Sequence, residues 1–225
     1  MNCDRIAPAY RWLEYAAFGC ALERRRLRYL GELAQARRAL VLGDGDGRFL
    51  ARLVRACPAQ VDYVDLSPRM LELARRRAAA ERVRYWVGDA RVLSWPGEEY
   101  DLIATHFFLD CFDDRDAPLL IERIARAARP GAVWILSEFR QPPAGWRAMW
   151  AAVWLRTLYW FFGIATGLAT RRLVDHRPLL RAHGFRLERE ETAWFGLLAS
   201  ELWRRGDYGT RQEKFAASST LPEPL

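Results

Sequence analysis

The sequence predicts an α/β fold in which helices cover both faces of a mostly parallel sheet. Between residues 38 and 140, short apolar runs alternate with segments of helical periodicity, which is typical of doubly wound sheets. The first apolar run, "RALVLG", ends abruptly in a glycine-rich loop, as a buried strand and its turn do. The chain has 225 residues, of which 51% are hydrophobic, and this suits one domain with a full core.

Strands and helices are expected in regular order along this region. Strand-like runs occupy 38–43, 61–67, 82–89, 99–108 and 130–139, the last after a Pro-Gly turn. Helical periodicity occupies 47–57, 68–80 and 116–129, and the first of these helices is expected to bury Phe49, Leu50, Leu53 and Val54. Pro68 favours a helix start, with Ser67 as its cap.

The last portion of the chain predicts a helix end followed by two strands. Gly184 ends the helix, and His183 before it is expected to be a capping charge. Two strand-like runs follow within 183–205. Residues 206–225 are polar and without periodicity, so we expect a loose tail.

The basic charge of the chain does not indicate a nucleic-acid partner. The formal net charge is +7, but Lys214 is the only lysine among 35 basic residues, and the arginines are scattered. Arginines spaced in this way among helix-forming residues predict solvated helix faces. The four cysteines, Cys3, Cys20, Cys57 and Cys111, lack metal-ligand spacing. Without a signal peptide, they indicate reduced thiols in a cytoplasmic protein that has no metal site.

The glycine loop predicts a ligand that carries positive charge. Gly43, Gly45 and Gly47 end the first strand, where the ligands of open α/β sheets bind and where missing side chains let a ligand approach the backbone. A dinucleotide needs glycine at the position of Arg48. Its pyrophosphate would also meet the carboxylates of Asp44 and Asp46, an unfavourable pairing of like charges.

This loop and four later segments resemble, in order and at fitting distances, the motifs of the class I S-adenosylmethionine (SAM)-dependent methyltransferases. The later segments are "VDLSPRML", "WVGDARVL", "YDLIATHFF" and "ARPGAVWIL". A glycine loop alone is weak evidence, whereas five ordered elements are specific. The resemblance implies SAM as cofactor and a Rossmann-like, seven-stranded, mostly parallel sheet with an antiparallel last strand.

The resemblance assigns cofactor roles residue by residue. Asp65 matches the acceptor for the ribose hydroxyls, since one carboxylate takes two vicinal donors. Met70 matches an apolar side chain on adenine, and Asp89 matches the acceptor for the adenine amino group. The implied set is Gly43, Asp44, Gly45, Asp46, Gly47, Asp65, Leu66, Met70, Asp89, Ala90, Thr105 and, in the lid, Tyr10.

One position departs from the family pattern. An acidic residue usually stands two positions before the first glycine, where this chain has Val41. Asp44 or Asp46 is expected to take over its role of anchoring the amino acid moiety of SAM. The alternative is that these aspartates cap the next helix or its turn, and Asp46 is the better placed of the two for that.

The resemblance implies a single methyltransferase domain over 1–205, with a SAM-binding core at 38–140 and a C-terminal hairpin at 183–205. Residues 1–37 are expected to form lid helices, because "CDRIAPAYRWLEYAAFG" resembles the opening of the ubiquinone/menaquinone C-methyltransferases. Inserted helices are expected at 141–182. Their aromatic residues between Trp146 and Phe162 predict a roof over a small apolar or aromatic acceptor, although packing on the core would also explain them.

Residues 157–170 carry no charge, but this run is shorter than the ~20 residues of a membrane span. Peripheral contact with a membrane surface stays open. The oligomeric state also stays open.

Two residues after the fourth strand are candidates for catalysis. His106 lies where this fold places the transferred methyl group, and an imidazole of near-neutral pKa would be a suitable base. Asp110 follows four residues later and is expected to orient His106 or bind the substrate; its alternative role is that of a carboxylate at a helix N-terminus. His176 and Arg177 face the pocket only if the lid closes as the resemblance suggests.

Three other functions compete with methyl transfer. A nicotinamide dehydrogenase shares the sheet, but Arg48 and Asp89 speak against it. A nucleic-acid methyltransferase would want a motif such as Asn-Pro-Pro-Tyr after the fourth strand, where this chain has "THFFLDCF". A non-catalytic SAM-fold binding protein stays open because Val41 weakens the expected cofactor site.

Overall fold

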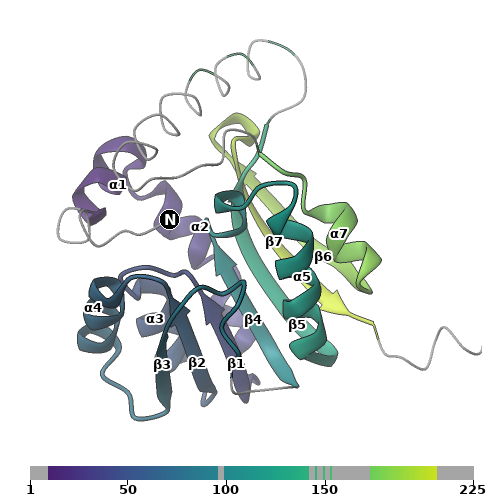
Figure 1. The fold of residues 1–225 in the computed structure, drawn as a ribbon. Coiled ribbons are helices and arrows are strands. Elements are labelled where there is room, and N and C mark those ends of the chain that lie inside the picture. The colour runs from purple at the N-terminus through teal and green to yellow at the C-terminus, as the bar shows by residue number, and fades with distance from the viewer. Residues whose placement is uncertain are drawn as a thin grey trace, which may run out of the picture.

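The computed structural model describes residues 10–95, 99–141, 145, 149, 153 and 173–206. Within these residues the centre is a seven-stranded sheet of order β3-β2-β1-β4-β5-β7-β6 (Figure 1). Strands β1 to β5 run parallel, while β7 lies between β5 and β6 and is antiparallel to both. The predicted fold class is therefore confirmed, including the antiparallel last strand.

The elements follow the predicted order. The strands are β1 (Arg38–Leu42), β2 (Gln60–Asp65), β3 (Val83–Val87), β4 (Tyr100–His106), β5 (Ala128–Phe139), β6 (Phe185–Ala193) and β7 (Leu198–Arg205). The α-helices are α1 (Tyr10–Phe18), α2 (Ala21–Arg26), α3 (Arg48–Ala56), α4 (Pro68–Ala78), α5 (Asp116–Ala127) and α7 (Arg177–Ala182). Short 3-10 turns are η1 (Leu30–Leu33), η2 (Leu109–Cys111) and η3 (Trp194–Gly196).

The fifth strand starts earlier than the sequence predicts. A Pro-Gly turn was expected before it, but Pro130 and Gly131 lie inside β5. The β4–β5 register shifts between Tyr100 and Leu102, so that Tyr100 pairs with Ala128 and Leu102 with Val133. This irregularity leaves Pro130, which has no N–H to donate, out of the ladder.

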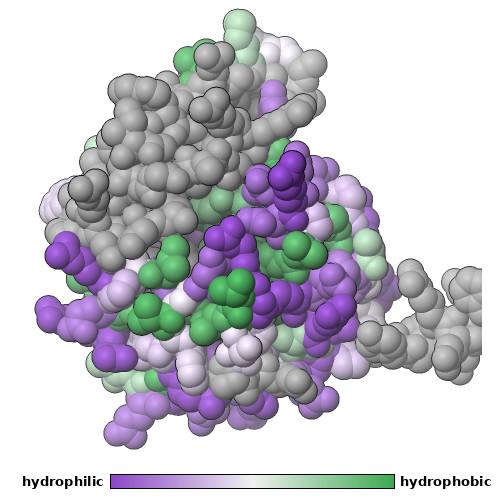
Figure 2. All heavy atoms as spheres, in the orientation of Figure 1, coloured by the Kyte–Doolittle hydropathy of each residue, from purple (hydrophilic) through white to green (hydrophobic). Residues whose placement is uncertain are grey.

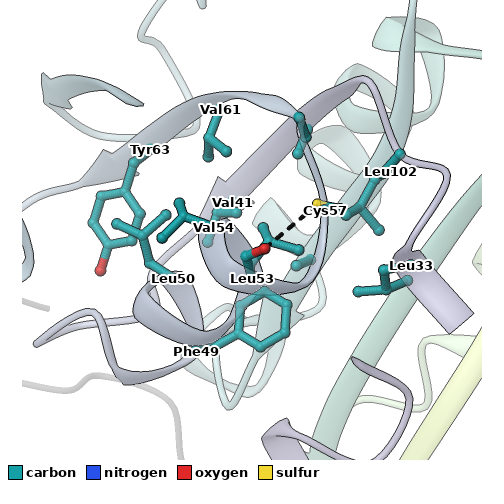
Figure 3. Packing of buried hydrophobic residues seen from close by; sticks show 14 of the residues in the cluster. Leu33, Val41, Phe49, Leu50, Leu53, Val54, Cys57, Val61, Tyr63 and Leu102 are labelled. Atoms are coloured by element: carbon teal, nitrogen blue, oxygen red, sulfur yellow. Dashed lines mark hydrogen bonds between the residues drawn. The ribbon is translucent and has the colours of Figure 1, made fainter. Parts of the chain in front are cut away.

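The sheet separates two hydrophobic layers because successive side chains of a strand point to opposite faces. On β1, Ala39 and Val41 join the core beneath α3 and α4, whereas Leu40 and Leu42 join the core beneath α5 and α7. All four side chains are fully buried. Figure 3 shows Val41 packed among side chains of α3 and β2, and the apolar face predicted for α3 is confirmed.

Local sequence signals set the ends of α4 as predicted. The Ser67 side chain accepts a hydrogen bond from the backbone N–H of Met70 at 3.1 Å, and Pro68 stands in the first turn. The predicted place of His183 is also confirmed, since it is the C-terminal flanking residue of α7.

Two predicted regions lie largely outside the described residues. The aromatic residues between Trp146 and Phe162 are among them, as are residues 207–225 of the expected tail. Among the helices that the structure does describe, none has the length and apolarity that crossing a membrane requires.

Candidate functional site

The carboxyl ends of the parallel strands bring the predicted site residues to one edge of the sheet. The glycine loop follows β1, Asp65 is the last residue of β2, Asp89 follows β3, and His106 is the last residue of β4. Helices α1 and α2 approach the same edge (Figure 1). Figure 2 shows hydrophobic surface in the middle of this view, with hydrophilic surface on either side of it.

The three glycines of the loop serve three different purposes. All have positive φ, at 64° for Gly43, 66° for Gly45 and 76° for Gly47, a region that other residues rarely adopt. A Cβ at Gly47 would lie 2.6 Å from Ala74 on α4, and one at Gly43 would overlap the ring of Phe108. At Gly45 it would meet only the Met70 sulfur, 4.0 Å away. The backbone open to a ligand is therefore that of Gly45.

Of the two aspartates in the loop, it is Asp44 and not Asp46 that caps the first turn of α3. Asp44 is 5% exposed, and its Oδ2 accepts the backbone N–H of Leu50, in the first turn of α3, at 3.0 Å. Asp46 makes no cap, because its carboxylate pairs with Arg48 at 3.0 Å and with Arg77 at 2.7 Å. The expectation that Asp46 is the better cap is wrong, since two guanidinium groups engage both of its oxygens.

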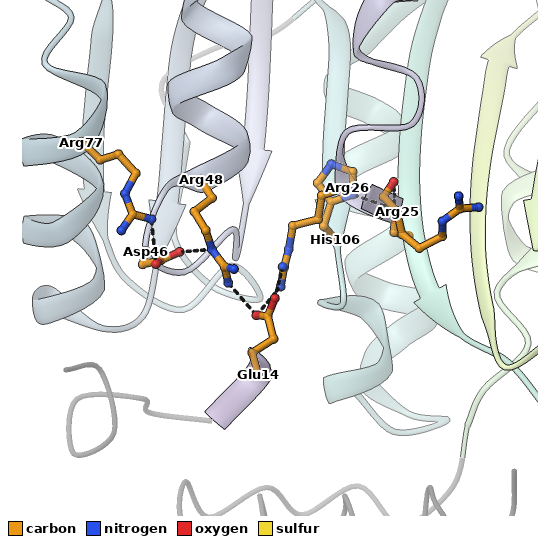
Figure 4. A network of polar contacts seen from close by, with 8 residues as sticks. Glu14, Arg25, Arg26, Asp46, Arg48, Arg77 and His106 are labelled. Carbon is orange, nitrogen blue, oxygen red and sulfur yellow. Dashed lines mark hydrogen bonds and ion pairs between the residues drawn. The ribbon is translucent and has the colours of Figure 1, made fainter. Parts of the chain in front are cut away.

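A buried ion network joins α1 to the glycine loop (Figure 4). Glu14 on α1 accepts hydrogen bonds from Arg26 at 2.6 and 3.0 Å and from Arg48 at 2.6 Å. Arg48 continues to Asp46, and Asp46 to Arg77 on α4. Burial acts to raise the pKa of Glu14, but the two guanidinium groups outweigh it and hold that pKa below its ordinary value.

The predicted ribose and adenine residues on β2 and α4 lie beside the loop. Asp65 is partly exposed, and its Oδ1 accepts the backbone N–H of Ser67 at 2.9 Å. Leu66 is 37% exposed, whereas Met70 is buried with its sulfur toward Gly45. These side chains form a partly apolar wall beside the open backbone of the loop.

Asp89 is engaged by a neighbouring arginine. Its carboxylate accepts three hydrogen bonds from the guanidinium of Arg91, at 2.6 to 3.0 Å, and one from the Arg91 backbone N–H. Hydrogen bonding from the Arg91 side chain lowers the pKa of Asp89, and Arg91 also pairs with Asp116. An adenine contact through Asp89 would have to share this carboxylate. Ala90, the next residue, is buried in the core.

Thr105 and Tyr10 were also predicted to contact the cofactor. Thr105 is completely buried, and its hydroxyl accepts a hydrogen bond from the indole N–H of Trp134 at 2.9 Å. The hydroxyl therefore faces the core beneath α5, and the cofactor contact predicted for Thr105 stays a prediction. Tyr10 is the first residue of α1, but its side chain lies outside the described part of the chain.

His106 is not the near-neutral base that its position suggested. The Ser137 hydroxyl donates to the carbonyl of Arg25 at 3.0 Å, so it accepts from Nδ1 of His106 at 3.1 Å. The ring is 3% exposed and packs edge-on against Phe49. Burial, and then the charge of Arg26, lower the pKa of His106 to about 3. The expectation of a pKa near neutrality is wrong, because no carboxylate among the described residues compensates the buried imidazolium.

Asp110 lies beside a second buried carboxyl group, Glu138 at the end of β5. Asp110 is 6% exposed and Glu138 is 4% exposed. Glu138 accepts the backbone N–H groups of Phe108, Leu109 and Asp110 at 3.1 to 3.4 Å, and so fixes the loop after β4. Burial raises the pKa of Asp110 to about 6, and burial with the neighbouring Asp110 raises that of Glu138 well above its ordinary value.

An aromatic cluster covers the carboxyl end of β5 and consists of Phe18, Phe107, Phe139 and Trp194. Ring centroids are 5.5 Å apart for Phe18 and Phe139, 5.3 Å for Phe18 and Trp194, and 5.1 Å for Phe107 and Phe139. Phe107 and Trp194 have positive φ, which is uncommon for bulky residues and occurs where the surroundings hold the backbone.

His176 and Arg177 do not gather at the glycine loop. Arg177 pairs with Glu201 on β7 at 2.6 Å and with Glu190 on β6 at 2.7 Å. His176 is buried, and burial lowers its pKa to about 4. Arg177 is thus held at the β6–β7 side of the sheet, and His176 is the N-terminal flanking residue of α7.

Sequence reasoning missed Glu14, Arg26, Glu138 and the aromatic cluster. Glu14 and Arg26 are single charges within helical segments, whose usual place is a solvated face. Two signals existed in hindsight: "HFF" ends the fourth strand, and "SEF" ends the fifth. Both segments end a parallel strand of the sheet, and the carboxyl ends of such strands are where ligands bind.

Comparisons with known proteins agree with this architecture. The family described as "Methyltransferase domain" matches residues 39–131. The chain is 33% identical over 147 residues to demethylmenaquinone methyltransferase of Thermus thermophilus, covering 63% of this chain and 66% of that protein. It is 34% identical over 146 residues to the Deinococcus radiodurans protein of the same name, covering 62% of this chain and 59% of that protein.

A solved structure extends the likeness beyond the matched core. N-methyltransferase NodS of Bradyrhizobium japonicum, in complex with S-adenosyl-L-homocysteine, superposes with a TM-score of 0.59 at 15% identity. The alignment covers 83% of this chain and 85% of NodS, and at this identity the likeness concerns the fold. With the strand order and the glycine loop, the match over residues 39–131 makes this chain similar to the class I SAM-dependent methyltransferases, enzymes whose cofactor is SAM.

Proposed function

We propose that this protein transfers a methyl group from SAM to a small apolar or aromatic acceptor. The observation that carries the proposal is the open backbone of Gly45 beside Asp65 and Met70, with the aromatic cluster at the same edge of the sheet and only β4 between β1 and β5. This arrangement supplies a polar cradle for a nucleoside and an apolar wall for an acceptor at the same edge of the sheet.

The residues at this edge fit the cofactor. A Cβ at Gly45 would occupy space that nothing but the Met70 sulfur borders among the described residues. Asp65 supplies a carboxylate for the ribose hydroxyls, and Met70 an apolar surface for adenine. Bound there, SAM would supply an electrophilic methyl group on its sulfonium.

The chain's own contribution to the reaction is to hold both partners and exclude water. An in-line approach at close range accounts for much of the rate of such a transfer. Glu14, Arg26 and Arg48 keep α1 and α2 against the glycine loop, where these helices would shield the reacting groups from solvent.

The acceptor class rests on the aromatic cluster and on the relatives. Flat aromatic rings pack well against Phe107, Phe139 and Trp194 in offset or edge-on arrangements. Two relatives are named demethylmenaquinone methyltransferases, and the chain spans 66% and 59% of their lengths. A quinol-like ring is therefore the first acceptor to test.

An acceptor hydroxyl or acidic carbon must lose a proton when it is methylated. We assign the proton acceptor to Asp110, because it lies in the turn η2 directly after β4, at the edge where the site residues gather, and burial raises its pKa to about 6. Glu138 holds the loop that carries Asp110.

The test is methyl transfer from tritiated SAM into small-molecule, lipid, RNA and protein fractions of an extract. Label in the small-molecule or lipid fraction, enhanced by added quinols, is expected. Label chiefly in RNA or protein would overturn the acceptor class. SAM binding without transfer to any fraction would favour a non-catalytic binding protein. Asp65→Ala should weaken S-adenosylhomocysteine binding by on the order of 1.5–3 kcal/mol.

A further inference from the structure

The position that is usually acidic in this family is filled with hydrocarbon here. Val41 is fully buried and packs among Leu50, Leu53 and Val54 (Figure 3). No polar ligand group reaches such a site without losing its hydration. The amino acid moiety of the cofactor must therefore find its partner elsewhere on the loop.

Asp44 has an unused acceptor atom at the right edge of the sheet. Its Oδ2 accepts the N–H of Leu50, but its Oδ1 is buried and has no hydrogen-bond partner among the described residues. A buried acceptor left unpaired costs about 1–3 kcal/mol, and more when it is charged. An atom of this kind in a native structure calls for a donor from outside the chain.

Within the glycine loop, Asp44 is the aspartate that has an acceptor atom left for a ligand donor. Both oxygens of Asp46 are engaged by arginines. Arg26 lies close enough to influence Asp44, yet its two terminal nitrogens both donate to Glu14. The residue next to Asp44 in the chain, Gly45, is the open point of the backbone.

We propose that Oδ1 of Asp44 accepts a hydrogen bond from the α-ammonium group of the cofactor's methionine moiety. Asp44 thereby replaces the acidic residue that Val41 displaces. This inference rests on the proposed function, since it takes SAM as the ligand. It assigns the ammonium contact to a residue within the loop rather than to the strand that precedes it.

The experiment compares two nucleosides that differ in the amino acid moiety. S-Adenosylhomocysteine carries the α-ammonium group, whereas 5′-methylthioadenosine lacks the whole moiety. Binding of both to wild type, Asp44→Asn and Asp46→Asn is measured by calorimetry. The Asp44→Asn variant keeps an amide oxygen for the N–H of Leu50, and Asp46→Asn is the matched loss of one charge from the same loop.

Asp44→Asn is expected to weaken S-adenosylhomocysteine binding about tenfold to hundredfold, because a charge-assisted hydrogen bond is lost. Its affinity for 5′-methylthioadenosine should stay within about twofold, which is the usual size of effects at a group that does not touch the ligand. Asp46→Asn should not separate the two nucleosides. Equal weakening of both ligands by Asp44→Asn, or no weakening, would overturn the inference.

The failure of the proposed function has a different signature. If wild type binds neither nucleoside, SAM is not the ligand, and the proposal for Asp44 falls with it. If wild type binds both with equal affinity, the nucleoside site stands and the ammonium contact is refuted. Thermal unfolding of each variant identifies any that fails to fold.

A measurement on wild type covers the case in which Asp44→Asn does not fold. Burial raises the pKa of Asp44 to about 7, and the charge of Asp46 also acts to raise it. Arg26, the N–H of Leu50 and Arg48 act to lower this pKa. The hydroxyl of Tyr63 also faces Asp44. The preference for S-adenosylhomocysteine over 5′-methylthioadenosine should therefore rise between about pH 5.5 and pH 7.5. A preference that does not change with pH would overturn the inference.

Discussion

The carboxylate of Glu14 accepts a hydrogen bond from the guanidinium of Arg48 at 2.6 Å, and this contact joins the first helix to the first residue of α3. Arg48 stands where a dinucleotide-binding loop would have glycine. Arg48, which argues against dinucleotide binding, thus has a structural role in this chain. It anchors α1 next to the glycine loop.

Replacing Glu14 with Gln should release this helix. Two buried guanidinium groups would lose their shared carboxylate, and breaking a buried pair from one side costs about 3–5 kcal/mol. We expect faster hydrogen exchange in α1 and α2 and a lower melting temperature. Glu72→Gln, which removes an exposed partner of Arg76, is the control. Unchanged hydrogen exchange in both helices would contradict the proposal that Glu14 holds α1 and α2 in place.

Alanine at Gly45 and at Gly47 should separate ligand binding from folding. Both positions have positive φ, which costs an L-residue about 1–2 kcal/mol. At Gly47 the new methyl would also press on Ala74, which adds about 1–3 kcal/mol. Gly47→Ala should therefore be the less stable variant in urea. Gly45→Ala should fold and lose SAM affinity. If this variant binds SAM as well as wild type does, the backbone of Gly45 is not where the cofactor approaches the loop.

Burial of His106 should make stability depend on pH. The unfolded imidazole titrates near ~6.5, whereas the folded pKa is about 3. Its contribution is fully present above pH ~6.5 and is lost as pH falls toward 3. Between about pH 7 and pH 5 the advantage of wild type over His106→Gln should shrink by about 2 kcal/mol. His183→Gln, which removes a partly exposed imidazole, is the control, and the same shrinkage there would refute the account.

The proton acceptor should be revealed by the pH–rate profile. If Asp110 acts as the base, kcat/KM should rise with pH through about 6, the pKa that burial gives it. Asp110→Asn should lower kcat by about 10²–10⁴ while S-adenosylhomocysteine affinity stays nearly unchanged. His106→Gln should keep the wild-type profile. A profile that disappears with His106→Gln, but survives Asp110→Asn, would restore the histidine as base.

The order of strands and helices could be predicted because each is a local pattern. Ser67 and Pro68 started α4 as expected, and the apolar spacing of α3 gave its buried face. The start of β5 was missed, since the ladder tolerates Pro130 only through a register shift that depends on β4. The register between two strands that are distant in the chain cannot be predicted from either strand alone.

The candidate site was predictable to the level of strand ends and no further. Position after a parallel strand placed the glycine loop, Asp65 and His106 at one edge. What each side chain does there depends on its neighbours: Trp134 takes the hydroxyl of Thr105, and burial removes the basicity of His106. Glu14 was invisible because its partners lie 12 and 34 residues away in the chain.

Strand β7 lies between β5 and β6 and completes the sheet from within. Among the described strands, the last in the sequence therefore occupies an interior position, and β6 joins the sheet only through it. A nascent chain that has not yet released residues 198–205 would expose the edge of β5, and β6 would have no strand beside it. Such an edge invites pairing with other chains. A frameshift or proteolytic cut just before Leu198 should thus produce an aggregating product rather than a smaller folded domain.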